Sequence, residues 1–326
     1  MCIIKLGADG DVIRTLPLIK GIKEQHPDSQ ITWVTKGDVA TLLTLVKGID
    51  QVVRLPYHGR DSFDIVYNCD VDQEALDLAE KLEAPLKYGY HAVDGFPVAY
   101  TPGAEYYLNT MFDDDLKKSN TKTYQQMLFE AMEVPYHTEY LGISLPEDER
   151  AAAQTWAREQ HIKTGKLIGI HMGASSRWPS KVWHPSCVKA FIRLAQEQEY
   201  SILLFGGPNE HATQGQMVEE LKREGIEVYR NDPLNSKRTF LGLLSLCKVL
   251  VCGDSFSLHA GVALKRPVVA LFFCTSPSEV EGYNLVTKLV SPQLLDFFPE
   301  KSDQYDEELT KSITPEQVLQ AVQEMT

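Results

Sequence analysis

The chain alternates short apolar runs with amphipathic stretches, and this alternation occurs in two series along its 326 residues. In the first series, runs of strand length lie at 2–6, 31–35, 51–55 and 64–68, and helical patterns lie at 12–22, 39–46 and 73–82. Pro17 falls inside the first helical pattern and is expected to kink it or to mark a late start. Strands that alternate with helices predict a parallel sheet covered on both faces.

A second series follows. Its predicted strands lie at 167–171, 201–205, 227–229, 250–252 and 268–272, and its helices at 185–198, 210–224, 239–247 and 257–264. Two such half-chains predict an α/β protein of two doubly wound, Rossmann-like domains with a cleft between them. We place an N-terminal domain at 1–155 and a C-terminal domain at 156–326, whose last helix, 315–325, could pack back on the first domain. Residues 91–122 are expected to form a long loop with one short helix.

The charge balance excludes some classes of partner. Lys and Arg number 32 against 45 Asp and Glu, a net charge of −13, which argues against nucleic acid and against a polybasic contact with an anionic membrane. Residues 1–150 carry 14 cations and 25 carboxylates, net −11, whereas residues 151–326 carry 18 and 20, net −2. An anionic ligand therefore fits the second half better.

The sequence predicts a cytoplasmic protein. No run of about 18 apolar residues could span a membrane, and the opening MCIIKLGADGD lacks the pattern of a signal peptide. The six cysteines are scattered without a CxxC pair, and we expect them to be buried, reduced thiols rather than disulfides or metal ligands.

Ligands in open α/β sheets bind beyond the carboxyl ends of the strands, which selects four loops. In the first, Gly7–Val12, Gly10 and Asp11 precede a helix, and Asp11 is either an N-cap or a carboxylate that projects into the cleft. Asp9 is a second carboxylate nearby, and mutual repulsion could raise a pKa. The spacing is not GxGxxG, so no dinucleotide fingerprint is predicted.

The second loop, 173–183, combines small residues with cations and aromatic residues. Ser175, Arg177 and Lys181 precede a helix whose N-terminus could meet an anion. The alternative is a solvated loop with Trp183 packed on the domain. Because exposed basic loops are scarce in so acidic a chain, we favour anion binding.

The third and fourth loops add polar groups at the same kind of position. Gly206 permits close approach, and Glu210 either caps its helix or binds sugar hydroxyls. Asp254 is followed by two potential N-caps, Ser255 and Ser257, and the free amides of this helix would suit a diphosphate. His259 is either a structural hydrogen-bonder or a cleft residue, and Thr275 and Ser276 follow the last predicted strand.

Over nearly its whole length the chain resembles glycosyltransferase family 9, the heptosyltransferase type of bacterial envelope biosynthesis. Four segments in order carry the resemblance: KLGADGDVIRTLP, GASSRWPSKVW, LLFGGPNE, and GDSFSLHAGVAL with LFFCTSP. The resemblance implies the GT-B architecture, with an acceptor on the first domain and a nucleotide-sugar, often ADP-heptose, on the second. It also implies an inverting reaction without a metal or cofactor, in lipopolysaccharide or related glycan synthesis at the cytoplasmic membrane face.

The same resemblance assigns roles. Asp11 would be the general base and Lys181 would neutralise the leaving diphosphate. Gly10, Ser175, Arg177 and Gly206 would contribute to donor binding, together with Glu210, Asp254, Ser255, His259 and Thr275. Two departures concern the donor site: Phe256 stands where the family usually has Gly, and Phe273-Cys274 where it usually has Gly-Pro. Both could narrow the pocket or stack on a base or sugar.

Two other functions fit the same pattern. A nucleotide-sugar epimerase of GT-B architecture would isomerise its substrate without an acceptor, and a non-catalytic protein would bind nucleotide-sugar without turnover. The acidity of the first half leads us to expect a neutral or weakly anionic acceptor and only transient contact with the membrane.

Overall fold

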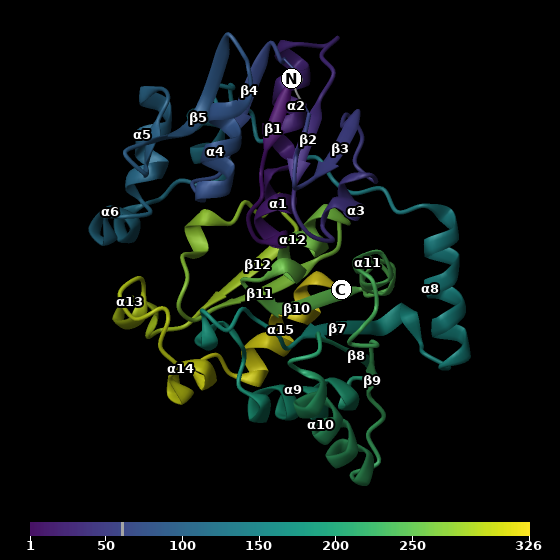
Figure 1. Ribbon diagram of the computed structural model, residues 1–326. Helices are drawn as coiled ribbons and strands as arrows, with labels where there is room; N and C mark the ends of the chain where they lie inside the picture. Colours follow the sequence, from purple (N-terminus) through teal and green to yellow (C-terminus); the bar gives the residue numbers. More distant parts are fainter. Residues whose placement is uncertain (60–61) are drawn as a thin grey trace. The chain divides into compact units, whose positions relative to one another are not determined.

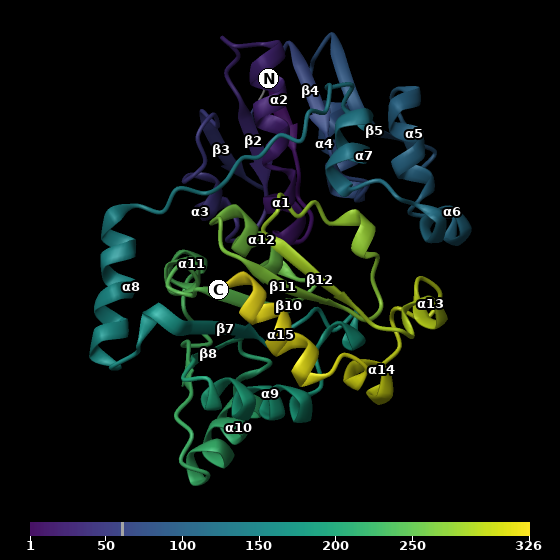
Figure 2. The same ribbon diagram turned by 180° about the vertical axis from the view of Figure 1, so that it is seen from behind.

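The computed structural model describes residues 1–59 and 62–326. The chain divides into two compact units, drawn in Figure 1 and, from behind, in Figure 2. Unit 1 comprises Met1–Ser144 and Ser278–Glu281, and unit 2 comprises Leu145–Pro277 and Gly282–Thr326.

The division precedes the predicted boundary at 155 because helix α8 (Glu147–Glu159) packs on α11 (Lys237–Leu244) of unit 2. Glu149 of α8 forms an ion pair with Arg238. Its carbonyl oxygen would lie 3.4 Å from a Cβ at Gly242, so the two helix backbones approach closely. α8 is thus part of the second unit rather than the end of the first.

Unit 1 is built on a six-stranded sheet in the order β3-β2-β1-β4-β5-β6. Its first five strands are parallel, and β6 is antiparallel to β5. The strands are β1 (Cys2–Ile4), β2 (Thr32–Thr35), β3 (Gln51–Arg54), β4 (Ile65–Asn68), β5 (Leu86–Val93) and β6 (Phe96–Ala99). The helices are α1 (Asp9–Thr15), α2 (Pro17–Gln25), α3 (Ala40–Leu43), α4 (Gln73–Lys81), α5 (Pro102–Asn109), α6 (Asp114–Ser119) and α7 (Tyr124–Ala131). This strand order is that of the Rossmann fold.

Local sequence explains two features of unit 1. All three residues of β1 are buried, as expected of a central parallel strand covered on both faces. The predicted kink at Pro17 is confirmed: α1 ends at Thr15, and α2 begins with Pro17 at its first position, where the missing N–H has no helical partner to lose.

The expected long loop at 91–122 is wrong. Strands β5 and β6 form a hairpin there, in which Val93 pairs with Phe96, and α5 and α6 follow. Asp94 and Gly95 both have positive φ, 51° and 81°, as the two central residues of a type I′ turn require. An Asp-Gly pair is a hairpin-turn signal, and it accounts for the order found in this segment. Figure 2 shows α5 beside α7.

Unit 2 repeats the same strand order with all six strands parallel, β12-β11-β10-β7-β8-β9. The strands are β7 (Leu167–His171), β8 (Ser201–Phe205), β9 (Tyr229–Arg230), β10 (Val249–Gly253), β11 (Val268–Phe272) and β12 (Val286–Val290). The other helices are α9 (Pro185–Glu197), α10 (His211–Arg223), α12 (Phe256–Ala263), α13 (Leu294–Phe297), α14 (Glu307–Lys311) and α15 (Pro315–Met325). Of these elements, β12, α13 and α14 were not predicted.

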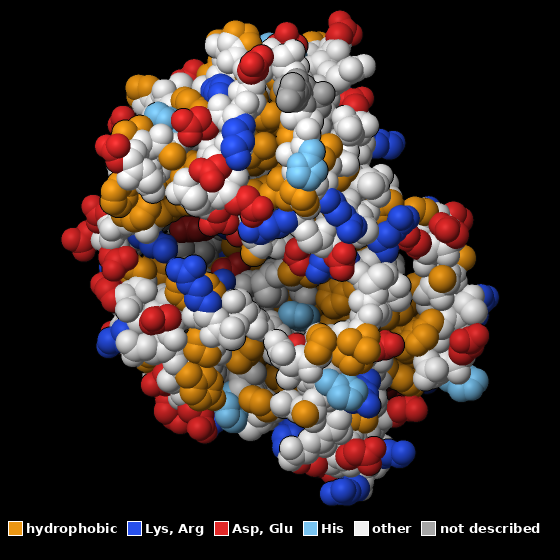
Figure 3. All heavy atoms as spheres, in the orientation of Figure 1, with side chains coloured by type: hydrophobic (Ala, Val, Ile, Leu, Met, Phe, Trp, Pro, Cys, Tyr) orange, Lys and Arg blue, Asp and Glu red, His pale blue; other side chains and the backbone are white. Residues whose placement is uncertain are grey.

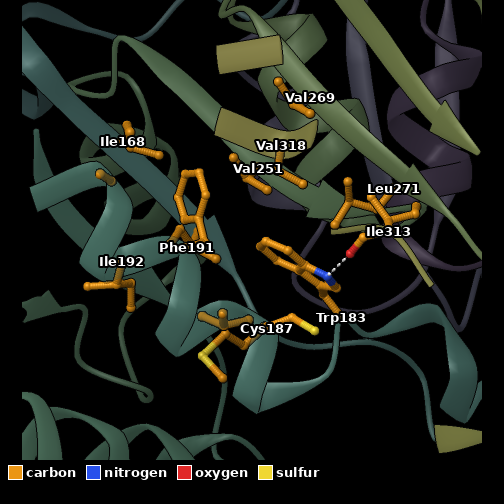
Figure 4. Close-up of a cluster of buried hydrophobic side chains, with 14 of the residues drawn as sticks. Ile168, Trp183, Cys187, Phe191, Ile192, Val251, Val269, Leu271, Ile313 and Val318 are labelled. Atoms are coloured by element: carbon orange, nitrogen blue, oxygen red, sulfur yellow. Dashed lines mark hydrogen bonds between the residues drawn. The ribbon is translucent and has the colours of Figure 1, made fainter. Parts of the chain in front are cut away.

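The last helix packs on the sheet and on α9 of unit 2. Val318, Ala321 and Val322 of α15 belong to a buried cluster with residues of α9 and the sheet. Figure 4 shows Val318 among the side chains of this cluster, with Trp183 and Phe191 nearby. Burial of this apolar stripe fixes α15 on the sheet of unit 2.

The six cysteines are buried free thiols, as predicted. Burial raises the pKa of Cys274 to about 11 and that of Cys252 further, so both are protonated at neutral pH. Within residues 1–59 and 62–326, no helix is both long and apolar enough to cross a membrane.

Candidate active site

Both sheets reverse their strand order at one place, between β1 and β4 in unit 1 and between β7 and β10 in unit 2. Ligands of doubly wound folds bind beyond the carboxyl ends of the strands at such a switch point. The loops predicted around Asp11, Lys181 and Asp254 all leave these strands.

Asp11 lies in the first turn of α1 and is not its N-cap. The cap position is held by Ala8, and no side chain caps this helix. The Asp11 carboxylate instead forms an ion pair with Arg14, with Oδ1 2.8 Å from Nη2. The Asp11 side chain is 35% exposed and the Arg14 side chain 16%. The sequence left two roles open for Asp11, an N-cap or a projecting carboxylate. The N-cap role is wrong, and the structure shows a partly exposed carboxylate paired with the largely buried Arg14.

The two neighbours of Asp11 that the sequence singled out have different surroundings. Asp9 is the first residue of α1 and is partly exposed. Gly10 is buried within the same turn.

Arg14 is held against α7. Its guanidinium carbon lies 3.8 Å from the ring centroid of Tyr124, a cation–π contact. The hydroxyl of Tyr124 is 2.7 Å from Oγ1 of Thr15, and Tyr107 of α5 meets the Tyr124 ring edge-on. Arg14 was not predicted from the sequence, although its i,i+3 spacing from Asp11 was a usable signal.

A second ion pair shapes the loop that carries Asp11. Nζ of Lys5, at the end of β1, donates to Oδ1 of Asp70 at 2.7 Å, and both side chains are nearly buried. The other oxygen of Asp70 accepts the backbone amides of Leu6 and Gly7. Burial alone would lower the pKa of Lys5, but Asp70 in contact with it contributes to holding that pKa well above its ordinary value. The pair fixes the first turn of the loop and was also missed from sequence.

In unit 2, the structure brings three of the predicted site residues together: Lys181, Asp254 and His259. Nζ of Lys181 is 3.0 Å from Oδ2 of Asp254, and Nε2 of His259 is 3.8 Å from Oδ1. The loops are packed so closely that a Cβ at Gly253 would lie 2.2 Å from the carbonyl oxygen of Lys181. Glycine is therefore required at the end of β10 to let the Lys181 loop cross it.

Ser255 stands at the N-cap position of α12, but its side chain makes no cap bond. Its Oγ lies 3.5 Å from Nδ1 of His171, the last residue of β7. Burial lowers the pKa of His171 to about 4, so the imidazole is neutral at pH 7. Ser257 is wholly buried, and its hydroxyl lacks a hydrogen-bond partner in the described structure. His171 was absent from the predicted site because it reads as the end of an apolar strand.

Glu210 does not cap α10 with its side chain. It occupies the N-cap position, but its Oε2 accepts the backbone amide of Gly207 at 2.8 Å. A Cβ on Gly173 would lie 2.9 Å from its carboxyl carbon, so the carboxylate rests against the loop after β7. Gly206 is buried because Glu210 and Gln214 fill the space where its Cβ would stand.

The remaining predicted residues separate into exposed and buried groups. Ser175 and Arg177 are exposed, and the Arg177 guanidinium lies 5.0 Å from the Trp178 ring centroid. Nζ of Lys181 lies 5.9 Å from the centroid of the same ring, so two cations lie near the Trp178 side chain. Thr275 is half-buried after β11.

Three aromatic residues and one serine of these loops are wholly or partly buried, and two of the aromatic residues belong to the core. Trp183 donates to the carbonyl of Ile313 at 3.0 Å and is core, as the alternative reading held (Figure 4). Phe273 is also core, which corrects the expectation that it narrows the donor pocket. Phe256 is half-buried, 5.7 Å from Phe240 and near Lys237. Ser276 is buried.

Among the described residues, no group of three or more His, Cys, Asp or Glu side chains is placed to hold a metal ion. The positive charges at the two switch points come from side chains: Lys5 and Arg14 in unit 1, and Lys181 in unit 2.

Comparison with known proteins gives consistent matches. The sequence model of glycosyltransferase family 9 (heptosyltransferase) matches residues 59–304. Lipooligosaccharide heptosyltransferase 2 of Haemophilus ducreyi is 24% identical over 350 residues, covering 97% of this chain and 96% of that protein. Lipopolysaccharide heptosyltransferase 1 of Salmonella typhimurium is 22% identical over 306 residues, covering 86% and 90%.

Solved structures share the fold. A family 9 glycosyltransferase from Veillonella parvula superposes with a TM-score of 0.81 at 20% identity, covering 99% of this chain and 96% of that one. The Escherichia coli ADP-heptose lipopolysaccharide heptosyltransferase II superposes with a TM-score of 0.74 at 16% identity, covering 99% and 97%. An Escherichia coli heptosyltransferase solved with ADP superposes with a TM-score of 0.66 at 16% identity, covering 100% of this chain and 99% of that one.

Proposed function

We propose, from the premise that this chain belongs to glycosyltransferase family 9, the heptosyltransferase family, that it moves a heptose or related sugar from a nucleotide-diphosphate donor to an envelope glycan or glycolipid. The chain is a glycosyltransferase whose two Rossmann-like units are of the GT-B type. The donor, the acceptor and the stereochemistry are the proposed parts. The observation that carries them is the placement of Asp11 and Lys181 in loops that leave the switch-point strands of the two sheets.

The donor diphosphate would bind unit 2. Lys181 supplies a positive charge beside the switch point, and the first amides of α12 provide donors of the kind that hold phosphate groups. Asp254 accepts a hydrogen bond from Lys181, so an incoming diphosphate would compete for the same ammonium group. The near-neutral second half of the chain favours this placement over unit 1. An ADP-linked donor is the first to test, because related heptosyltransferases were solved with ADP and with ADP-heptose.

Asp11 would act as the general base. Its carboxylate would accept the proton of an acceptor hydroxyl while that oxygen bonds to the anomeric carbon of the donor sugar. The bond from that carbon to the phosphate oxygen breaks, and its electron pair leaves with the diphosphate. Lys181 would stabilise the charge that develops there. A single displacement of this kind inverts the anomeric configuration.

We propose that no metal ion is needed, because the ammonium of Lys181 and the amides of α12 supply the positive potential that a leaving diphosphate requires. The direct test is to assay sugar transfer with EDTA and then with added Mg²⁺. Unchanged rates support the proposal, and an EDTA-sensitive rate that Mg²⁺ restores contradicts it.

A neutral or weakly anionic acceptor fits unit 1. Both cations near Asp11 are engaged, Arg14 by Asp11 and Lys5 by Asp70. Three further cations also lie against carboxylates, in the pairs Lys36 with Glu74, Arg54 with Asp38 and Lys122 with Glu130. On the face drawn in Figure 3, acidic and basic side chains are intermingled. A heavily phosphorylated acceptor would have to displace these carboxylates, so we expect a less charged one.

Transient contact with the cytoplasmic face of the inner membrane follows if the acceptor is a glycolipid, and no nucleic-acid partner is proposed. The membrane contact can be tested by flotation with vesicles that carry a candidate glycolipid, with vesicles that lack it as the control. Co-flotation that depends on the glycolipid supports the proposal, and strong binding to vesicles without it indicates a permanent membrane contact.

The identity of the donor can be tested by thermal shift against a panel of nucleotide-sugars, followed by turnover. A ligand at 100 times its Kd adds about 2.7 kcal/mol of stability. Stabilisation by one donor and acceptor-dependent release of its nucleotide are the expected results. Conversion of the donor to an isomer without an acceptor would identify an epimerase. Tight binding with neither transfer nor hydrolysis would identify a non-catalytic protein.

A further inference from the structure

We propose that Arg14 is the positioning residue for Asp11: its guanidinium, fixed on the Tyr124 ring, orients the carboxylate that takes the acceptor proton. This inference rests on the proposed role of Asp11 as base. Arg14 of α1 and Tyr124 of α7 would then contribute to catalysis without touching the substrate. Three observations carry it.

The first is the gradient of burial along the ion pair. The two side chains are one helical turn apart on α1, with Oδ1 of Asp11 2.8 Å from Nη2 of Arg14. The Arg14 side chain is less than half as exposed as that of Asp11. The cation is therefore the anchored partner, and the carboxylate is the partner that solvent or substrate can reach.

The second observation is that Arg14 is fixed at both its ends. The ring of Tyr124 covers the guanidinium at 3.8 Å, and Gln125, the next residue of α7, donates to the Arg14 carbonyl at 3.1 Å. The Tyr124 hydroxyl is in turn 2.7 Å from Thr15 Oγ1, which also donates to the carbonyl of Asp11. Helix α7 thus holds both the side chain and the backbone of the turn that bears Asp11.

The third observation is the charge around the pair. Burial by itself lowers the pKa of Arg14, but the Asp11 carboxylate raises it above its usual range, so the guanidinium stays charged. Other charged or titratable groups that face the pair are Lys5, which follows β1, Tyr107 from α5, Tyr124 from α7, and Glu279 from the segment Pro277–Glu279. Lys5 forms its ion pair with Asp70, and Arg14 is in direct contact with Asp11.

A guanidinium suits this position better than an ammonium. It is planar, so it can lie flat on the Tyr124 ring while its edge meets the carboxylate, whereas a lysine ammonium is a compact charge on a flexible stem. The arrangement places a positive charge beside the Asp11 carboxylate and holds that carboxylate in one orientation. Loss of Arg14 would therefore change both the rate of the chemical step and the pH at which the base becomes protonated.

The test compares four variants by the pH dependence of kcat and kcat/KM for sugar transfer. Arg14→Met removes the charge, Arg14→Lys keeps the charge without the planar contact, and Asp11→Asn removes the base. Lys20→Met is the matched control, because Lys20 is an exposed cation on the adjacent helix α2. We expect the control to behave like the unaltered enzyme.

For Arg14→Met we expect kcat to fall about tenfold or more, with donor KM within about twofold, because the donor binds unit 2. The acidic limb of the kcat/KM profile should move up by about one pH unit or more, since an adjacent cation lowers a carboxyl pKa by roughly 1–3 units. Arg14→Lys should keep the acidic limb in place but lose kcat several-fold, about threefold or more.

Two outcomes separate failure of this inference from failure of the proposed function. If Asp11→Asn is inactive while Arg14→Met and Arg14→Lys keep the original kcat and acidic limb, the positioning role of Arg14 is overturned. If Asp11→Asn transfers sugar at the original rate, the assignment of the base is overturned instead. Should Arg14→Met fail to fold, Arg14→Lys decides the matter through its kcat.

Discussion

Nζ of Lys181 lies 3.0 Å from Oδ2 of Asp254, which joins the loop after β7 to the loop after β10 at the switch point of unit 2. The two side chains are only 16% and 18% exposed. This partly desolvated ion pair keeps the ammonium group in place at the edge of the sheet where an anion would bind.

Replacement of Lys181 by Met should weaken nucleotide binding. We expect the Kd for ADP to rise by about tenfold or more, because truncation of one partner of a buried charge pair costs roughly 2–5 kcal/mol. Isothermal titration calorimetry measures it directly. Lys189→Met is the matched control, since Lys189 forms its ion pair with Glu220 elsewhere on unit 2. Equal affinities of the three proteins would remove Lys181 from the donor site.

Replacement of Gly253 by Ala should destabilise unit 2. The new Cβ would lie 2.2 Å from the Lys181 carbonyl oxygen, so the loop has to move. Overpacking of this kind costs about 1–3 kcal/mol or more, measurable as a lower midpoint of urea unfolding. Gly165→Ala is the control, because no described heavy atom lies within 4 Å of its Cβ position. Equal midpoints for the two variants would contradict the close crossing of the loops.

Replacement of Asp70 by Asn should destabilise unit 1 by about 3–5 kcal/mol, because it leaves the ammonium of Lys5 buried without a counter-charge. The double variant Lys5→Met/Asp70→Asn should recover much of that loss, since the unpaired charge is then gone. Asp72→Asn, at an exposed carboxylate nearby, serves as the control in the same urea titration. A single variant as stable as this control would show that the pair does not stabilise the loop.

The neutral state of His171 predicts a pH-dependent stability. Its pKa is about 4 in the folded chain and about 6.5 when unfolded, so the unfolded chain binds the extra proton between these values. Stability therefore rises with pH from about 4 to 6.5, and acidification across that window costs roughly 1–3 kcal/mol. His171→Asn should lose this part of the pH dependence in urea unfolding at pH 4.5 and pH 7. An identical pH dependence in both proteins would contradict a buried neutral imidazole.

The architecture was predictable because every strand–helix unit carries its own local signal. Apolar runs such as 167–171 and 201–205 coincide with β7 and β8, and Pro17 separates α1 from α2 as expected. Asp94-Gly95 is a signal for the turn of the hairpin at 86–99. The hairpin was nevertheless missed, because its strands carry polar and half-exposed residues that break the apolar pattern. β12 was missed for the same reason, since it is half-buried with Lys288 inside it.

The site was predictable where its residues follow a strand and precede a helix, as Asp11, Lys181 and Asp254 do. Partners that meet only in the folded chain were not. Lys5 and Asp70 are 65 residues apart, and Arg14 and Tyr124 are brought together by the packing of α1 on α7. Phe273 was misjudged because its place after β11 is known from sequence, but the burial of its side chain in the core is not.

The most direct test of the account is the rate of sugar transfer by Asp11→Asn beside Asp9→Asn, with the donor identified by thermal shift. Both changes remove one carboxylate from the first turn of α1. The account predicts that kcat falls by about 100-fold or more in Asp11→Asn alone, because general base catalysis contributes roughly 10²–10⁴-fold. Nucleotide binding, measured by thermal shift, should be unchanged in both. Transfer by Asp11→Asn at the rate of the unaltered enzyme would contradict the account.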